Sequence, residues 1–191
     1  MRRLIVALVL SCTVASAMNA RDRSLARRLA DPRTRQSAVD EVEKAGSEKI
    51  PLLLSWTRHP PAHVNALGLY IGLADAFGTL KAKEAVPFLI KNISLGRTGA
   101  LDTLMRSDDV IESQMPSVAA LIRIGGSASD AVMRACWGPM TSEDRLAAIF
   151  VVSRSAKEIP DARGFLNVAI AYARMQHDLA ERGLKRLQGR P

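Results

Sequence analysis

The sequence predicts an all-α fold, a short α-solenoid of about four antiparallel helix pairs. The first observation is a pattern that occurs twice, in residues 45–54 and 77–90. Each copy has the end of a helical stretch, a glycine, a charged turn, a β-branched residue, a proline and an apolar run. Ile50 and Val86 hold the same place in the two copies and lie 36 residues apart, a period typical of helical repeats. The second observation is composition: 48% of the residues are hydrophobic but only 4% are aromatic, which favours closely packed aliphatic helices.

The first 17 residues are expected to be a signal peptide rather than part of this fold. Arg2 and Arg3 form a positive start, residues 4–10 are an unbroken apolar run, and residues 15–17 are a small-residue cleavage site. Cleavage there would leave Met18 as the first residue of an exported protein, periplasmic or secreted. No later stretch has the apolar length of a spanning helix, so no transmembrane segment is expected in the mature chain.

Cys12 supports an alternative localisation. Residues 9–12, Val-Leu-Ser-Cys, resemble the lipobox of bacterial lipoproteins, in which the cysteine becomes the acylated first residue. That family favours Leu where Val9 stands and a smaller residue where Leu10 stands. The resemblance implies a protein anchored to a membrane through Cys12.

Residues 24–188 are predicted to form one helical repeat domain. Asp31-Pro32 is interpreted as a helix start, with Asp31 as the cap and Pro32 in the first turn. Apolar residues then recur at helical spacing until Gly46, which is expected to end the helix. Pro51 lies where a first turn tolerates a missing N–H. Residues 50–54 give the paired helix its inner face.

The second pair repeats this order after the break at Pro60-Pro61. Helical spacing runs through residues 64–74, Gly78 is expected to end that helix, and residues 86–93 form its partner. Two such helices cannot bury their apolar faces alone, so we expect the pairs to stack.

The repeat is then interrupted. Residues 94–115 have few regular apolar stripes and are predicted to be an irregular insertion, either a loop or a short helix. A weaker third copy covers residues 119–132. A fourth, degenerate pair begins with a capping box at residues 141–144 and continues, from Pro160, to about residue 188.

At these positions the chain resembles HEAT-type α-solenoid repeats. Residues 31–39 look like the start of such a repeat, residues 46–54 like its turn and second helix, and residues 77–90 like a good copy of the latter. The resemblance implies a surface that binds other macromolecules. Iron-dependent hydroxylases of this architecture carry repeated His-Glu pairs, which this sequence lacks, and an exported protein fits the phycobilin lyase subunits poorly.

No arrangement of residues indicates catalysis, a cofactor or a metal. His59 and His63 have a spacing that could place two ligands on one helix face, but Pro60 and Pro61 separate them and no further ligand is near in sequence. Cys136 is expected to be a small buried hydrophobic residue, because no motif places a histidine partner beside it. The prediction is therefore that the protein is not an enzyme.

The formal charge is +8, and it would fall to +6 once residues 1–17 are removed. The basic residues are spread along the chain among acidic ones, which is typical of solvated helix faces, so no nucleic-acid partner is expected. We expect an exported scaffold that binds another protein. The alternatives are an enzyme or ligand carrier that uses a groove between repeats, and a lipid-anchored envelope protein.

The irregular insertion is the expected contact surface. Insertions in repeat arrays often gather on one face, which is commonly the binding face. The charged residues in this one make a candidate interaction loop: Arg106, Asp108, Asp109 and Glu112.

Overall fold

The structure is a computed structural model that describes residues 19–96, 108–155, 163–171 and 174. Every regular element in these residues is helical, so the all-α prediction is confirmed. The α-helices are α1 (Ala20–Ala30), α2 (Arg35–Ala45), α3 (Ile50–Arg58), α4 (Ala66–Thr79), α5 (Val86–Lys91), α7 (Asp108–Gln114), α8 (Pro116–Ile124), α9 (Gly126–Cys136) and α10 (Ser142–Arg154). Two 3₁₀ turns, η1 (Gly46–Lys49) and η2 (Lys83–Ala85), precede α3 and α5, and residues 163–171 are also helical.

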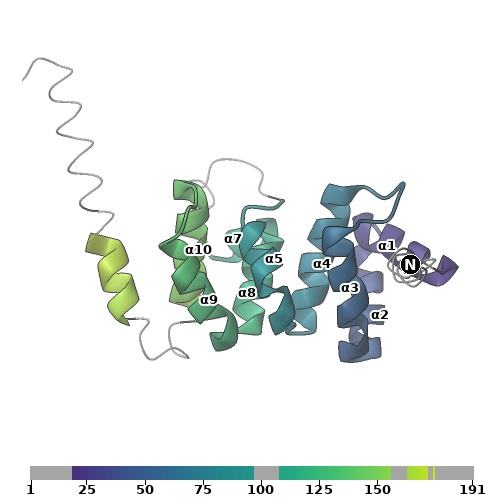
Figure 1. The fold of residues 1–191 in the computed structure, drawn as a ribbon, viewed down its shortest axis with the longest axis horizontal. Helices are drawn as coiled ribbons and strands as arrows, with labels where there is room; N and C mark the ends of the chain where they lie inside the picture. Colours follow the sequence, from purple (N-terminus) through teal and green to yellow (C-terminus); the bar gives the residue numbers. More distant parts are fainter. Residues whose placement is uncertain (1–18, 97–107, 156–162, 172–173, 175–191) are drawn as a thin grey trace, which may run out of the picture.

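The described helices lie side by side in a row (Figure 1). The α1 and α2 helices occupy one end, while α9, α10 and then residues 163–171 occupy the other. The α4 helix packs most extensively on α8 and α1, and it joins the two halves of the row. One continuous apolar core follows the row, from Leu25 on α1 to Phe165.

None of the described helices could cross a membrane. The longest of them, α4, has 14 residues, and no helix in the described ranges combines the length and apolar character of a span. The predicted signal peptide and Cys12 lie outside the described residues.

Gly46 and the two prolines of the repeated pattern lie at helix ends. Gly46 caps the end of α2 with a φ of +72°, a backbone conformation that glycine adopts without strain. Pro51 and Pro87 lie in the first turns of α3 and α5, where no helical hydrogen bond needs their missing N–H. Thr141 caps α10 by accepting a hydrogen bond from the Asp144 backbone at 3.0 Å, as the capping box predicts.

The predicted helix start at Asp31-Pro32 is wrong. Asp31 ends α1 instead, and α2 begins only at Arg35. The Asp31 carboxylate accepts a hydrogen bond from the Arg33 backbone N–H at 2.9 Å, which folds the chain into a short turn before α2. An aspartate followed by proline is equally compatible with a helix start and with a turn between two helices, so the sequence alone does not distinguish them.

The predicted end at Gly78 is correct to within one residue, since α4 ends at Thr79, but the cap is Leu80 and not the glycine. A Cβ atom at Gly78 would lie 2.8 Å from the Cα of Ala120 on α8. Gly78 therefore allows two helix backbones to approach closely, and it does not terminate a helix.

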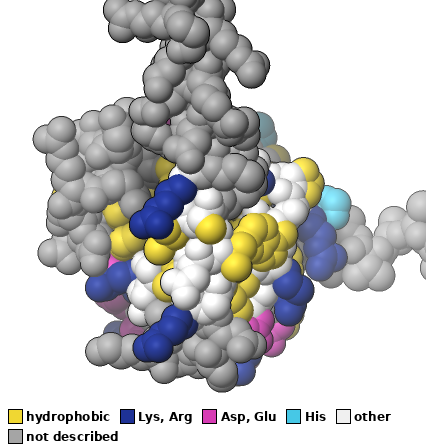
Figure 2. Space-filling model, turned by 90° about the vertical axis from the view of Figure 1, so that its left-hand side faces the viewer, with side chains coloured by type: hydrophobic (Ala, Val, Ile, Leu, Met, Phe, Trp, Pro, Cys, Tyr) yellow, Lys and Arg dark blue, Asp and Glu magenta, His cyan; other side chains and the backbone are white. Residues whose placement is uncertain are grey.

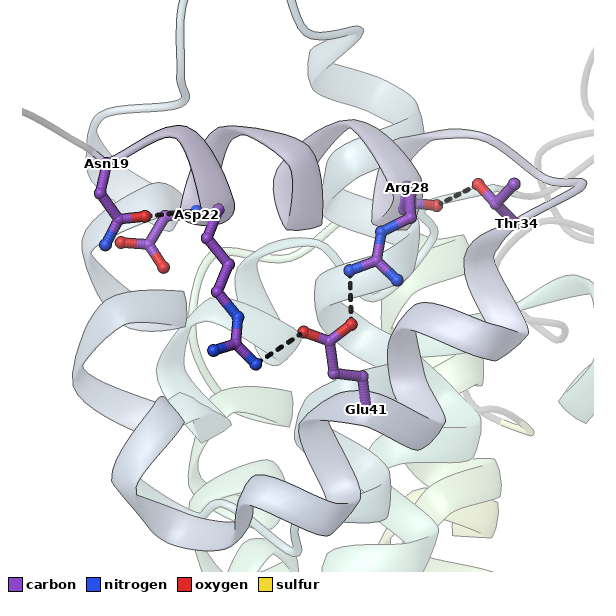
Figure 3. Close-up of polar contacts among 6 residues, drawn as sticks. Asn19, Asp22, Arg28, Thr34 and Glu41 are labelled. Atoms are coloured by element: carbon purple, nitrogen blue, oxygen red, sulfur yellow. Dashed lines mark hydrogen bonds and ion pairs between the residues drawn. The ribbon is translucent and has the colours of Figure 1, made fainter.

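The α1 helix is tied to α2 by polar contacts (Figure 3). Arg28 Nη2 lies 2.5 Å from Glu41 Oε2, and Thr34 Oγ1 donates to the Arg28 carbonyl at 3.0 Å. Arg21 Nη2 reaches the other Glu41 oxygen at 3.9 Å. These contacts, led by the Arg28 hydrogen bond, lower the pKa of Glu41.

Candidate functional site

A hollow of about 480 Å³ lies between α9 and residues 163–171, at the end of the row opposite α1. Figure 2 looks onto this end, where apolar side chains are exposed between basic ones. We call the hollow the α9 groove. Its lining combines large apolar side chains with one acid and one base, and it comprises Asp130, Met133, Arg134, Trp137, Gly164, Phe165 and Val168.

Trp137 is the most distinctive side chain of the α9 groove, because 55% of its surface is exposed. Its indole meets the ring of Phe165 edge to face, with 5.6 Å between the ring centroids and 71° between the ring planes. Phe165 itself is buried. Phe165 therefore supports one side of the tryptophan, while about half of the tryptophan surface remains exposed.

The backbone that carries Trp137 is fixed by hydrogen bonds. Trp137 is the C-terminal cap of α9, and its N–H donates to the Arg134 carbonyl at 3.3 Å. Arg145 of α10 donates from Nε to the Cys136 carbonyl at 2.9 Å and from Nη2 to the Gly138 carbonyl at 3.3 Å. The guanidinium thus binds carbonyls at the end of α9, which positions the indole without burying it.

The polar side chains of the groove stand on one face of α9. Asp130 and Arg134 are four residues apart, so they are neighbours on that helix, and both are exposed. Their charges suit a polar rim around an apolar surface. Among the described residues of the lining, no pair of groups could act as nucleophile and base.

Cys136 lies next to Trp137 in sequence but points into the core, as the sequence predicts. Burial raises the pKa of its thiol to about 11, although Arg145 opposes the shift. The thiol is therefore protonated at neutral pH and is a poor nucleophile.

Three of the four residues of the predicted interaction loop lie on α7. Arg106 lies outside the described residues, and Asp108 and Asp109 begin α7. Glu112, one turn later, accepts a hydrogen bond from Arg154 Nε of α10 at 3.2 Å and forms an ion pair with Arg154 Nη2 at 3.1 Å. This contact attaches α7 to α10, and Ser94 similarly donates to the Asp144 carboxylate. The contact role of this segment stays a prediction.

The two neighbouring histidines do not share a helix. His59 follows the last residue of α3, and His63 lies in the next turn with a φ of +62°. Within the described ranges, no three His, Cys, Asp or Glu side chains come together as a set that could hold a metal ion.

A partly buried carboxyl, that of Asp75, lies in the middle of the row. Burial raises the pKa of Asp75 on α4, while the positive charges of Arg35 and Arg123 oppose that rise. A single carboxyl between two arginines offers no acid–base pair, so it does not form a catalytic site with them.

No protein-family model, curated protein or solved structure matches this chain. The candidate site is therefore assigned from the geometry of this chain alone. Sequence reasoning missed the α9 groove because Trp137 follows an apolar helical stretch and looks like a core residue. The adjacent Gly138-Pro139 break was the available signal, since it places the tryptophan at a helix end.

Proposed function

We propose that this chain is a non-enzymatic helical-repeat scaffold, exported from the cell, that binds another protein through the α9 groove. The exposed indole of Trp137 is the observation that carries the proposal. A rigidly held, half-exposed tryptophan keeps a large apolar surface in water, and such surfaces are typical of binding sites.

The composition of the groove favours a protein partner. Tryptophan and arginine are the residues most enriched among those that dominate the energy of protein interfaces. Here Trp137 and Arg134 lie within one turn of α9, beside the flexible side chain of Met133. Methionine adapts its shape to a partner, while the supported indole stays in place.

The size of the groove indicates what the partner inserts. About 480 Å³ accommodates a few large apolar side chains, such as those on one face of an amphipathic helix. Asp130 and Arg134 would then pair with polar groups at the edge of that helix. An apolar face with charged flanks is therefore the expected recognition element.

Site-specific crosslinking tests this proposal. A photoreactive residue replaces Val168, a groove residue that is 53% exposed, so that Trp137 stays intact. The control variant carries the same residue at Leu67 on α4, which is 58% exposed. We expect one protein to crosslink at position 168 and not at position 67, and the purified form of that protein to bind the unmodified chain. Equal crosslinking at both positions would contradict the proposal.

The exported location has its own test. Mass spectrometry of the protein purified from its native host determines the mature N-terminus. Cleavage before Met18 supports the secreted or periplasmic form, and an acylated Cys12 supports the anchored form. An intact residue 1 would contradict both.

A further inference from the structure

Another hollow among the described residues lies on α1, at the end of the row opposite the α9 groove (Figure 1). It has a volume of about 370 Å³, and the described residues that line it all come from α1: Ala20, Arg23, Ser24, Arg27 and Arg28. We call this surface the arginine face of α1. Three of its five residues are positively charged and none is acidic.

The amphipathic pattern of α1 produces this surface. Leu25, Ala26 and Leu29 are buried against the neighbouring helices, so the opposite side of α1 faces outward. Arg23, Ser24 and Arg27 are exposed on that outer side. Four arginines and one aspartate give the helix a net charge of +3.

The charges of the arginine face are only partly neutralised. Glu41 of α2 binds Arg28, as Figure 3 shows, and also draws in Arg21. Arg23 and Arg27 have no ion-pair partner among the residues that the structure describes. They are four apart on the helix, so their guanidinium groups extend from neighbouring positions over the same hollow.

We infer that the arginine face of α1 docks on an anionic phospholipid surface. Guanidinium groups bind phosphate oxygens through paired hydrogen bonds, and Ser24 adds a hydroxyl donor. Arg23, Ser24 and Arg27 are exposed, so the phosphates of lipid headgroups can reach their side chains. The charge is of one sign over the whole face, which suits a negatively charged membrane.

The position of this face in the sequence fits the same partner. Ala20 lies eight residues after Cys12, so an extended chain would span at most about 28 Å between them. A single acyl chain binds membranes only marginally, and a basic surface is the usual second signal. An acylated Cys12 and the arginine face could therefore act on one membrane. The inference is independent of the α9 groove.

Vesicle binding tests the inference. The purified protein, with Cys12 shown by mass spectrometry to carry no acyl chain, is sedimented with vesicles of phosphatidylglycerol and phosphatidylcholine, or of phosphatidylcholine alone. We expect binding to the anionic vesicles only. The double variant R23Q/R27Q should lose binding about 25-fold, since a basic residue at an anionic surface contributes about fivefold.

Two further variants distinguish binding by this surface from an effect of the protein's overall charge. R58Q/K91Q removes the same charge from exposed positions on α3 and α5 and should bind nearly as well as the unmodified protein. R23K/R27K keeps the charge and should retain most of the binding, since surface attraction depends mainly on charge. Circular dichroism checks that each variant remains helical. The inference is overturned if both vesicle types bind alike, if R58Q/K91Q loses as much as R23Q/R27Q, or if the lysine variant binds no better than the glutamine variant.

Discussion

Gly72 of α4 lies directly against the backbone of Leu29 on α1. A Cβ atom at Gly72 would stand 2.3 Å from the Leu29 carbonyl oxygen and 2.9 Å from its carbonyl carbon. A Cβ atom at Gly68, one turn earlier, would stand at the same distance from the carbonyl oxygen of Ala30. The α1 and α4 helices therefore pack with their backbones nearly in contact, and α1 depends on this for its place at the end of the row.

The first prediction concerns this contact. Gly72→Ala should lower the free energy of unfolding by about 1–3 kcal/mol, because the new methyl group meets backbone that must move away. The gain in helix propensity, about 1 kcal/mol, offsets only part of that cost. Urea denaturation followed by circular dichroism measures the change.

Gly164→Ala is the matched control. It is the same substitution in another helical stretch, but a Cβ atom there would meet nothing within 4 Å. It should stabilise the protein slightly or leave it unchanged. If Gly72→Ala were also neutral, the helices would not be packed as closely as the structure has them.

The second prediction concerns pH. The pKa of Glu41 is lowered, chiefly by the hydrogen bond from Arg28, so the folded state favours its charged form. That contribution is present above the unfolded pKa of about 4.3 and is lost as the pH falls through the folded value. Because the pair is partly exposed, Glu41→Gln should cost only about 0.5 kcal/mol near neutral pH. The cost should shrink as the pH falls below the unfolded value and vanish once Glu41 is protonated in both states.

Urea denaturation of both proteins across this pH range measures the difference. Glu43→Gln is the control, because Glu43 is an exposed residue of the same helix. A Glu41→Gln effect that stays constant from neutral to acid pH would rule out the ion pair as its cause.

The third prediction concerns the thiol of Cys136. With a pKa raised to about 11 by burial, it should carry about a hundredfold less thiolate near pH 8 than an ordinary cysteine. A Cys12→Ser variant should therefore react with a thiol reagent at least that much more slowly when folded than in concentrated denaturant. The pH dependence of stability that Cys136 produces has the opposite sign to that of Glu41. Above about pH 9 the unfolded thiol ionises first, so stability falls as the pH rises.

Fast reaction of the folded protein would contradict the buried position of Cys136. A Cys136→Ala variant identifies the part of the alkaline loss that comes from this thiol, since the variant lacks the ionising group. The difference in slope between the two proteins above pH 9 is the quantity to compare.

The sequence was sufficient for features that depend on local chemistry. Gly46, Pro51 and Pro87 occupy the predicted places because a positive φ or a missing N–H restricts where such residues fit. The role of Gly78 could not be predicted in this way. Its reason is Ala120, which lies 42 residues away in sequence and comes into contact only when α4 packs on α8.

In the candidate site, too, the features that the sequence did not predict depend on contacts between distant residues. Glu112 stands out in the sequence as part of an acidic group, but its partner Arg154 is 42 residues away. In the sequence, Trp137 looks like a core residue because it follows Val132 and Cys136, which are apolar and are buried in the structure. Its exposure follows from where α9 ends and from the position of Phe165, and neither can be deduced from a helical pattern.

The central claim, that the α9 groove binds a protein, is tested most directly by the affinity of the purified crosslinked partner for Trp137→Ala. Isothermal titration calorimetry should show at least a tenfold higher Kd than for the unmodified protein, since truncation of a hot-spot tryptophan typically costs about 2 kcal/mol or more. Leu67→Ala, which removes an exposed side chain from α4, should leave the Kd unchanged. An unchanged Kd for a folded Trp137→Ala protein would contradict the claim.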